Sequence, residues 1–170
     1  MKWIGALLLV STTTWIGFDM GNKLTERTKQ IKQLILSLQM IEAEMGYSQL
    51  NLQQTFQNVS KKTTYPMNQF YEGLANQLLG IVTDIQQVWD EELSKLTNIS
   101  ALKNDELEVM RQFGKTIGQH TFYDQQKQIT LAIHYLEREL DIAMEQRNKY
   151  EKMVKSLGVL IGLFLVFLLL

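Results

Sequence analysis

The chain lacks several residue types that would point to particular chemistries. It contains no cysteine, which excludes disulfides and thiolate metal sites. Only two histidines occur, His120 and His134, and their separation fits no metal-binding motif such as HExxH. The formal net charge of -1 gives no general attraction to nucleic acid. With a single proline, Pro66, and many Leu, Gln, Glu and Lys residues, we expect an all-α chain.

One stretch weakly resembles a catalytic motif. Residues 114–116 (GKT) look like the end of a phosphate-binding loop, but that loop needs a glycine where Val109 stands and a strand where we expect a helix. Residues 90–92 (DEE) form a charge run that we expect to be solvated, beside a Trp89 packed in the core. No nucleophile, base and orienting residue can be combined. We therefore predict no catalytic site, no cofactor and no metal.

Each end of the chain carries an uncharged apolar segment. As a helix, Trp3 to Phe18 would span about 24 Å, a little under the roughly 30 Å of a membrane core. The segment from Leu157 to the carboxyl terminus is apolar throughout. We expect membrane segments at 1–20 and 153–170 around a central domain at 21–152. A cleaved signal peptide is the alternative for the first segment, although no convincing cleavage site precedes Asp19.

The placement of lysine and arginine predicts the orientation in the membrane. Basic residues cluster on the central-domain side of both apolar segments, whereas only Lys2 stands on the far side. The clusters are Lys23, Arg27, Lys29 and Lys32 after the first segment, and Arg147, Lys149, Lys152 and Lys155 before the second. By the positive-inside rule, the central domain is cytoplasmic and both chain ends lie across the membrane.

Apolar residues recur every three or four positions in the central domain, which predicts amphipathic helices. The expected helices cover residues 24–45 (with a bend or end near Gly46 and a continuation to about 56), 67–79, 81–96, 105–117 and 122 onward, with loops at 61–66 and 98–104. Gly118 should end one helix and Thr121 should cap the next. An apolar seam runs from Ile129 to Ile161. We therefore expect an antiparallel helical bundle, flanked by transmembrane helices, whose last helix is continuous with the C-terminal membrane segment.

A pair of glycines in the C-terminal segment has the spacing of a helix-packing motif. Gly158 and Gly162 form a GxxxG pattern, and small residues four apart allow two membrane helices to approach closely. The pattern also arises by chance in apolar segments, so a pairing role and a chance occurrence both remain open.

Several stretches resemble one known family. They are Phe113 to His120 (FGKTIGQH), Gln125 to Ile129 (QQKQI), Lys152 to Leu160 (KMVKSLGVL) and, more weakly, Ile41 to Tyr47 (IEAEMGY). In their order, and with the two apolar ends, they resemble the stage III sporulation protein AB family of endospore-forming bacteria. The resemblance covers essentially the whole chain.

The resemblance implies a non-catalytic platform protein in the mother-cell membrane, part of the channel between mother cell and forespore. Its bundle is similar to the cytoplasmic domains of platform proteins in type II secretion and type IV pilus machines, so the implied partners are a secretion-type ATPase and other channel proteins. Self-association is a further expectation. A membrane-anchored regulatory or sensor module is the alternative function. The candidate docking residues, for which a turn or a solvated face is the simpler explanation, are Glu42, Glu44, Tyr47, Lys115, Gln119, His120 and Gln125.

Overall fold

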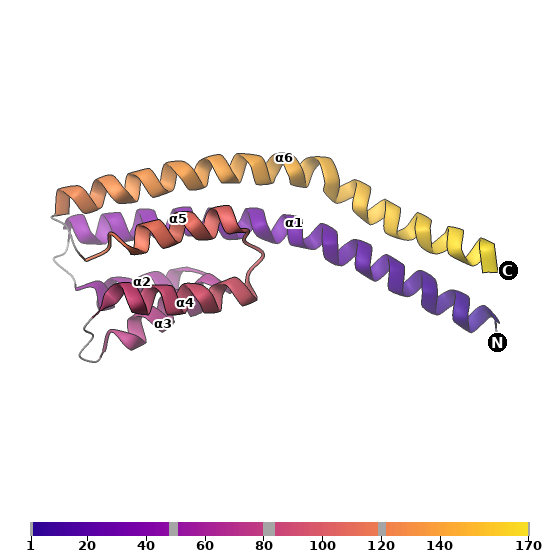
Figure 1. Cartoon of the computed structure of the whole chain (residues 1–170), viewed down its shortest axis with the longest axis horizontal. Coiled ribbons are helices and arrows are strands. Elements are labelled where there is room, and N and C mark those ends of the chain that lie inside the picture. The colour runs from indigo at the N-terminus through magenta and orange to yellow at the C-terminus, as the bar shows by residue number, and fades with distance from the viewer. Residues whose placement is uncertain (1, 48–50, 80–83, 119–121, 170) are drawn as a thin grey trace. The chain divides into compact units, whose positions relative to one another are not determined.

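The structure is a computed structural model that describes residues 2–47, 51–79, 84–118 and 122–169. These residues form helices and no strands (Figure 1), which confirms the predicted all-helical class. The helices are α1 (Lys2–Tyr47), α2 (Leu52–Lys62), α3 (Met67–Gln77), α4 (Ile85–Ile99), α5 (Asn104–Gly114) and α6 (Phe122–Leu169).

The chain divides into two compact units. Met1–Thr28 and Asp141–Leu170 form the first, which we call the terminal unit. Lys29–Leu140 forms the second, which we call the bundle unit. The long helices α1 and α6 each lie partly in the terminal unit and partly in the bundle unit, whereas α2 to α5 belong to the bundle unit alone.

Helix boundaries follow the local capping chemistry. The side chain of Asp84 accepts hydrogen bonds from the backbone amides of Gln86 and Gln87, so α4 begins at Ile85 and not at the expected residue 81. The same helix continues to Ile99, into the region expected as a turn. Gly118 has the left-handed φ of 77°, but it lies three residues beyond the C-cap residue Lys115 and so does not end the helix as predicted.

Other boundaries also differ by a few residues. The fifth helix ends at Gly114, short of the predicted residue 117, because the amide of Thr116 bonds to the carbonyl of Phe113 and tightens the chain into a turn. Helix α1 runs unbroken from Lys2 to Tyr47, whereas the sequence predicted a separate helix that begins near residue 24. Helix α6 is a single helix from Phe122 to Leu169, as its continuous apolar register predicted. Thr121, the predicted cap of α6, lies outside the described residues.

The core of the bundle unit is an aromatic cluster contributed by four short helices. Trp89 of α4 is fully buried, and its ring centroid lies 5.2 Å from that of Phe70 on α3 and 5.4 Å from that of Phe113 on α5, both edge-on. Phe56 of α2 lies 6.1 Å from both Trp89 and Tyr71. Edge-on ring pairs contribute about 0.5–1.5 kcal/mol each beyond their burial. The cluster confirms the predicted core position of Trp89.

The long helices cover this cluster with the apolar faces that the periodicity predicted. On α1 the buried positions recur every three or four residues: Ile31, Leu34, Ile35, Leu38 and Ile41. On α6, Ile129 and Leu136 are buried as expected. Ser37 of α1 shares a buried hydrogen bond of 2.5 Å with the hydroxyl of Tyr71 on α3, which also joins α1 to the short helices.

The prediction of a solvated charge run at residues 90–92 is wrong for one member. Glu92 is only 5% exposed, whereas Asp90 and Glu91 are exposed. Its carboxylate accepts hydrogen bonds of 2.5 Å from Gln77 Nε2 and 2.6 Å from Lys95 Nζ. Because these partners satisfy the buried charge, Glu92 can join α3 to α4, a pairing that the local sequence does not reveal.

In the terminal unit, α1 and α6 run side by side (Figure 1). Arg27 is buried, and its guanidinium donates a 2.9 Å hydrogen bond to the side-chain carbonyl of Gln146. Within the described residues, no helix holds a stretch long and apolar enough to cross a membrane. The two predicted membrane segments are therefore not confirmed.

Candidate interaction surface

Of the predicted docking residues on α1, Glu44 contacts α2. Glu44 accepts a 2.9 Å hydrogen bond from Asn58 Nδ2 and lies 3.8 Å from the ammonium of Lys62. Glu42 is half-buried, and the side chain of Tyr47 lies outside the described residues. The Glu44 carboxylate thus already interacts with Asn58 and Lys62 of α2, and a docking partner would have to compete with these contacts.

The second group of predicted docking residues is only partly described. Lys115 is exposed in the turn after α5, and its backbone carbonyl accepts a 2.5 Å hydrogen bond from Gln86 Nε2. Gln119 and His120 lie outside the described residues. Gln125 is 6% exposed, so its side chain faces the interior of the bundle unit.

The glycines singled out from the sequence have different positions. Gly158 and Gly162 lie in α6, but their surroundings fall outside the described part of the chain. Gly114, from the stretch that weakly resembles a phosphate-binding loop, is the buried last residue of α5 and packs against Trp89. It does not start a helix, as the glycine of such a loop must, so its role here is close packing.

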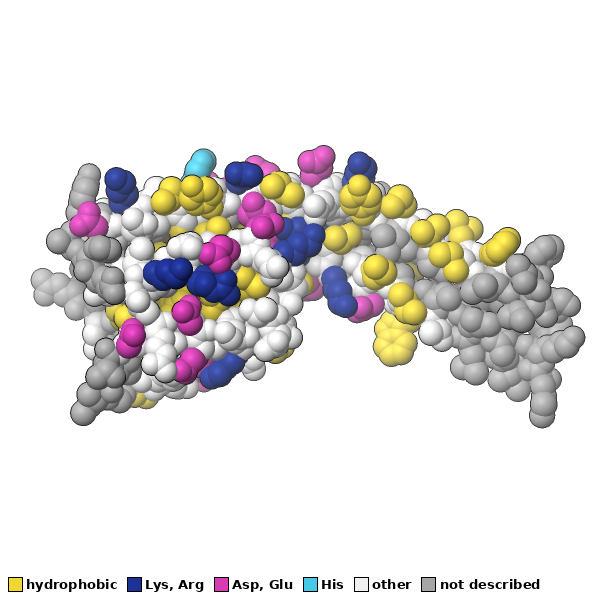
Figure 2. Space-filling model, in the orientation of Figure 1, with side chains coloured by type: hydrophobic (Ala, Val, Ile, Leu, Met, Phe, Trp, Pro, Cys, Tyr) yellow, Lys and Arg dark blue, Asp and Glu magenta, His cyan; other side chains and the backbone are white. Residues whose placement is uncertain are grey.

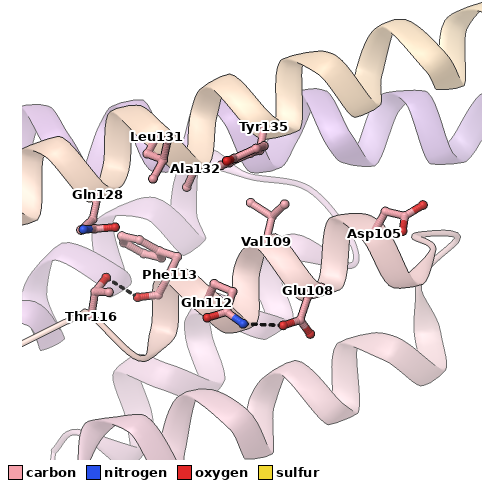
Figure 3. A pocket seen from close by; sticks show the side chains of 10 residues that line it. All are labelled: Asp105, Glu108, Val109, Gln112, Phe113, Thr116, Gln128, Leu131, Ala132 and Tyr135. Atoms are coloured by element: carbon pink, nitrogen blue, oxygen red, sulfur yellow. Dashed lines mark hydrogen bonds between the residues drawn. The ribbon is translucent and has the colours of Figure 1, made fainter.

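A groove between α5 and α6 was not predicted from the sequence. It has a volume of about 520 Å³ and lies wholly within the bundle unit (Figure 3). Ten side chains line it: Asp105, Glu108, Val109, Gln112, Phe113 and Thr116 from α5 and the turn after it, and Gln128, Leu131, Ala132 and Tyr135 from α6. Leu131 and Tyr135 stand 46% and 47% exposed, although both are large apolar side chains.

The groove has chemically distinct ends (Figure 3). Val109, Ala132 and Leu131 form its apolar middle, Gln128 and Thr116 mark one end, and Asp105 marks the other. Figure 2 shows apolar side chains and carboxylates on this face of the bundle unit, with lysine and arginine side chains among them. Of the ten lining residues two are acidic and none is basic.

Glu108 is held in place on the rim of the groove. Gln112 Nε2 and Arg111 Nη1 each donate a 2.6 Å hydrogen bond to its carboxylate. The bond from Gln112 and then that from Arg111 lower the pKa of Glu108 below its ordinary value, so this carboxylate stays ionised near neutral pH. Its charge is balanced by the paired guanidinium of Arg111.

The groove had a weak signal in the sequence. Leu131 and Tyr135 are four residues apart and fall outside the seam of Ile129 and Leu136, so they define a second apolar strip on the same helix. The strip becomes a groove only because α5 lies beside it. Among the described residues, no group of histidine, aspartate and glutamate is placed to hold a metal ion.

The fold defines a small, all-helical protein in which four short helices pack with two long ones. The family model for stage III sporulation protein AB matches residues 2–170. The stage III sporulation protein AB of Bacillus subtilis (strain 168) is 39% identical over 169 residues, covering 99% of both chains. A solved structure of a stage III sporulation protein AB matches with a TM-score of 0.69 and 33% identity, covering 73% of this chain and 98% of that one.

The chain therefore belongs to the stage III sporulation protein AB family. The family resemblance drawn from the sequence motifs is confirmed. Membership makes this a sporulation protein with a helical-bundle fold, and the family is named for a developmental stage and not for a reaction.

Proposed function

We propose that this protein is a non-catalytic, membrane-anchored platform of the sporulation channel between mother cell and forespore. Its bundle unit docks a secretion-type ATPase on the cytoplasmic side of the mother-cell membrane. Other channel proteins bind the same platform. The proposal rests on family membership together with the arrangement of apolar and polar surfaces in the chain.

The single observation that carries the membrane anchor is the apolar surface of the terminal unit. Trp15 is 77% exposed, and Leu160 and Phe164 are 60% and 63% exposed. Figure 2 shows such apolar side chains crowded along this unit. A surface this rich in large apolar groups needs a non-aqueous cover, and the apolar composition of both chain ends favours lipid.

The bundle unit has the features expected of a docking body. Its aromatic core fixes four short helices, and its surface presents a groove with exposed apolar side chains. The chain is 39% identical, over almost its whole length, to a stage III sporulation protein AB, so a role in sporulation is the economical assignment. The proposed docking of an ATPase rests on the similarity to platform proteins of secretion machines that the family resemblance implies.

The proposal is tested by a detergent pull-down of the tagged full-length protein from sporulating cells. Mass spectrometry of the recovered proteins should identify a secretion-type ATPase and further channel components. Recovery of a kinase or a transcription factor in their place would support the sensor alternative and contradict the platform.

Orientation has its own test, which the absence of cysteine makes simple. A single cysteine at Gln69, an exposed residue of α3, should react with a membrane-impermeant maleimide only after the cells are permeabilised. Labelling of intact cells would place the bundle unit outside and refute the cytoplasmic assignment.

A further inference from the structure

We propose that the groove between α5 and α6 binds an amphipathic helix of a partner protein that presents apolar side chains and one lysine or arginine. The proposal deepens the platform function and rests on it, because it assigns the docking surface and the chemistry of the docked segment. Neither Asp105 nor Tyr135 was among the docking residues considered from the sequence.

The shape of the groove favours a helix as its occupant. Both walls are helices, and α5, with its 11 residues, is about 16 Å long at 1.5 Å per residue. That length matches about three turns of a docked helix. Apolar residues at three- and four-residue spacing on such a helix would lie over Val109, Ala132 and Leu131, as in other helix-in-groove complexes.

Charge complementarity assigns the partner's cation. Asp105 lies at one end of the groove in the first turn of α5, and Glu108 follows one turn later. Glu108 is already paired with Arg111 at 2.6 Å, so Asp105 is the lining carboxylate that we assign to the partner's lysine or arginine. The exposed ring of Tyr135 adds a face on which a guanidinium or ammonium can rest.

A photo-crosslinking amino acid at Gln112 tests the proposal in the full-length chain in sporulating cells. Gln112 is exposed on the groove, and its amide bonds to Glu108 one turn away on α5. Gln87 is the matched control, because it is exposed on α4 and its amide bonds to Glu91 one turn away. The crosslinked peptide is sequenced by mass spectrometry.

We expect one discrete adduct from Gln112 and none of that kind from Gln87. Its partner peptide should have helical apolar spacing and a lysine or arginine. Asp105→Asn and Leu131→Gln should each reduce the adduct at least fivefold. Leu36→Gln, which changes a similarly exposed leucine on α1 away from the groove, should leave it unchanged.

Other outcomes overturn the proposal. An absent adduct, equal adducts from both positions, or a partner that is lipid or a second copy of this chain would each refute the assigned occupant. The pull-down separates the two proposals. If channel proteins co-purify but none crosslinks at Gln112, the groove assignment fails and the platform stands. If the crosslinked helix belongs to a protein outside any sporulation channel, the groove stands and the platform fails.

Discussion

Replacing Gly114 with alanine should destabilise the bundle unit, although alanine is the better helix former. A Cβ built on Gly114 would lie 2.1 Å from Trp89 Cδ1 and 2.5 Å from its Nε1. The indole cannot move easily, because it is fully buried and its Nε1 donates a 2.9 Å hydrogen bond to the carbonyl of Met110. Either the ring or the end of α5 must shift.

The magnitude follows from the opposing effects. Overpacking of a filled core costs about 1–3 kcal/mol. The better helix propensity of alanine returns about 0.5–1 kcal/mol in a helix interior, and less at the last residue of α5. The net loss is therefore about 1–2 kcal/mol. That loss corresponds to a roughly 5- to 30-fold rise in the fraction of opened molecules.

Gly73→Ala is the matched comparison. A Cβ there would lie 2.2 Å from Glu92 Oε2, but this atom is the far end of a flexible side chain. The carboxylate can swing aside while losing part of its bonding to Gln77 and Lys95. We expect the cost of Gly73→Ala to be smaller than that of Gly114→Ala.

Hydrogen exchange of the full-length protein in detergent micelles measures the effect. Amides of α4 and α5 that exchange through opening of the aromatic core should exchange roughly 5- to 30-fold faster in Gly114→Ala. In a Trp89→Phe background, which removes the indole Nε1, the same substitution should cost less. Unchanged or slower exchange in Gly114→Ala, or full additivity with Trp89→Phe, would refute the packing argument.

Three further predictions follow from buried or capping polar groups. Burial raises the pKa of the Tyr71 phenol, so the folded state keeps this proton above pH 10 while the unfolded state loses it. The free energy of unfolding, measured by urea titration, should therefore fall as the pH rises above 10, and it should fall less steeply in Tyr71→Phe. Glu44→Lys removes the hydrogen-bond acceptor of Asn58 and places a like charge near Lys62. Hydrogen exchange should then show that the free energy of opening α2 falls by about 1 kcal/mol, while Glu44→Gln stays near wild type. Asp84→Ala removes the cap of α4 and should cost about 1 kcal/mol, seen as faster exchange of the first-turn amides, whereas unchanged exchange would contradict the capping role.

Much of the fold was determined by local sequence. The spacing of Ile31, Leu34 and Leu38 selects a helix and its buried face, and the positive φ of Gly118 follows from the lack of a Cβ. The ends of the helices were harder to predict from the sequence, because several nearby residues can serve as caps. Helix α4, for example, begins at Ile85 and not at the predicted residue 81. The family could also be identified from motifs, since these are read along the chain.

The tertiary structure decided which residues meet across helices. Glu92 looked like one member of a solvated charge run, yet packing of α3 against α4 buries it over Gly73 and gives it Gln77 as a partner. The α5–α6 groove likewise joins Asp105 to Tyr135, residues far apart in the chain. Periodicity specifies which face of a helix is apolar, because it depends on one helix alone. Which faces pair, and what lies between them, depends on how the helices pack, and no single segment carries that information.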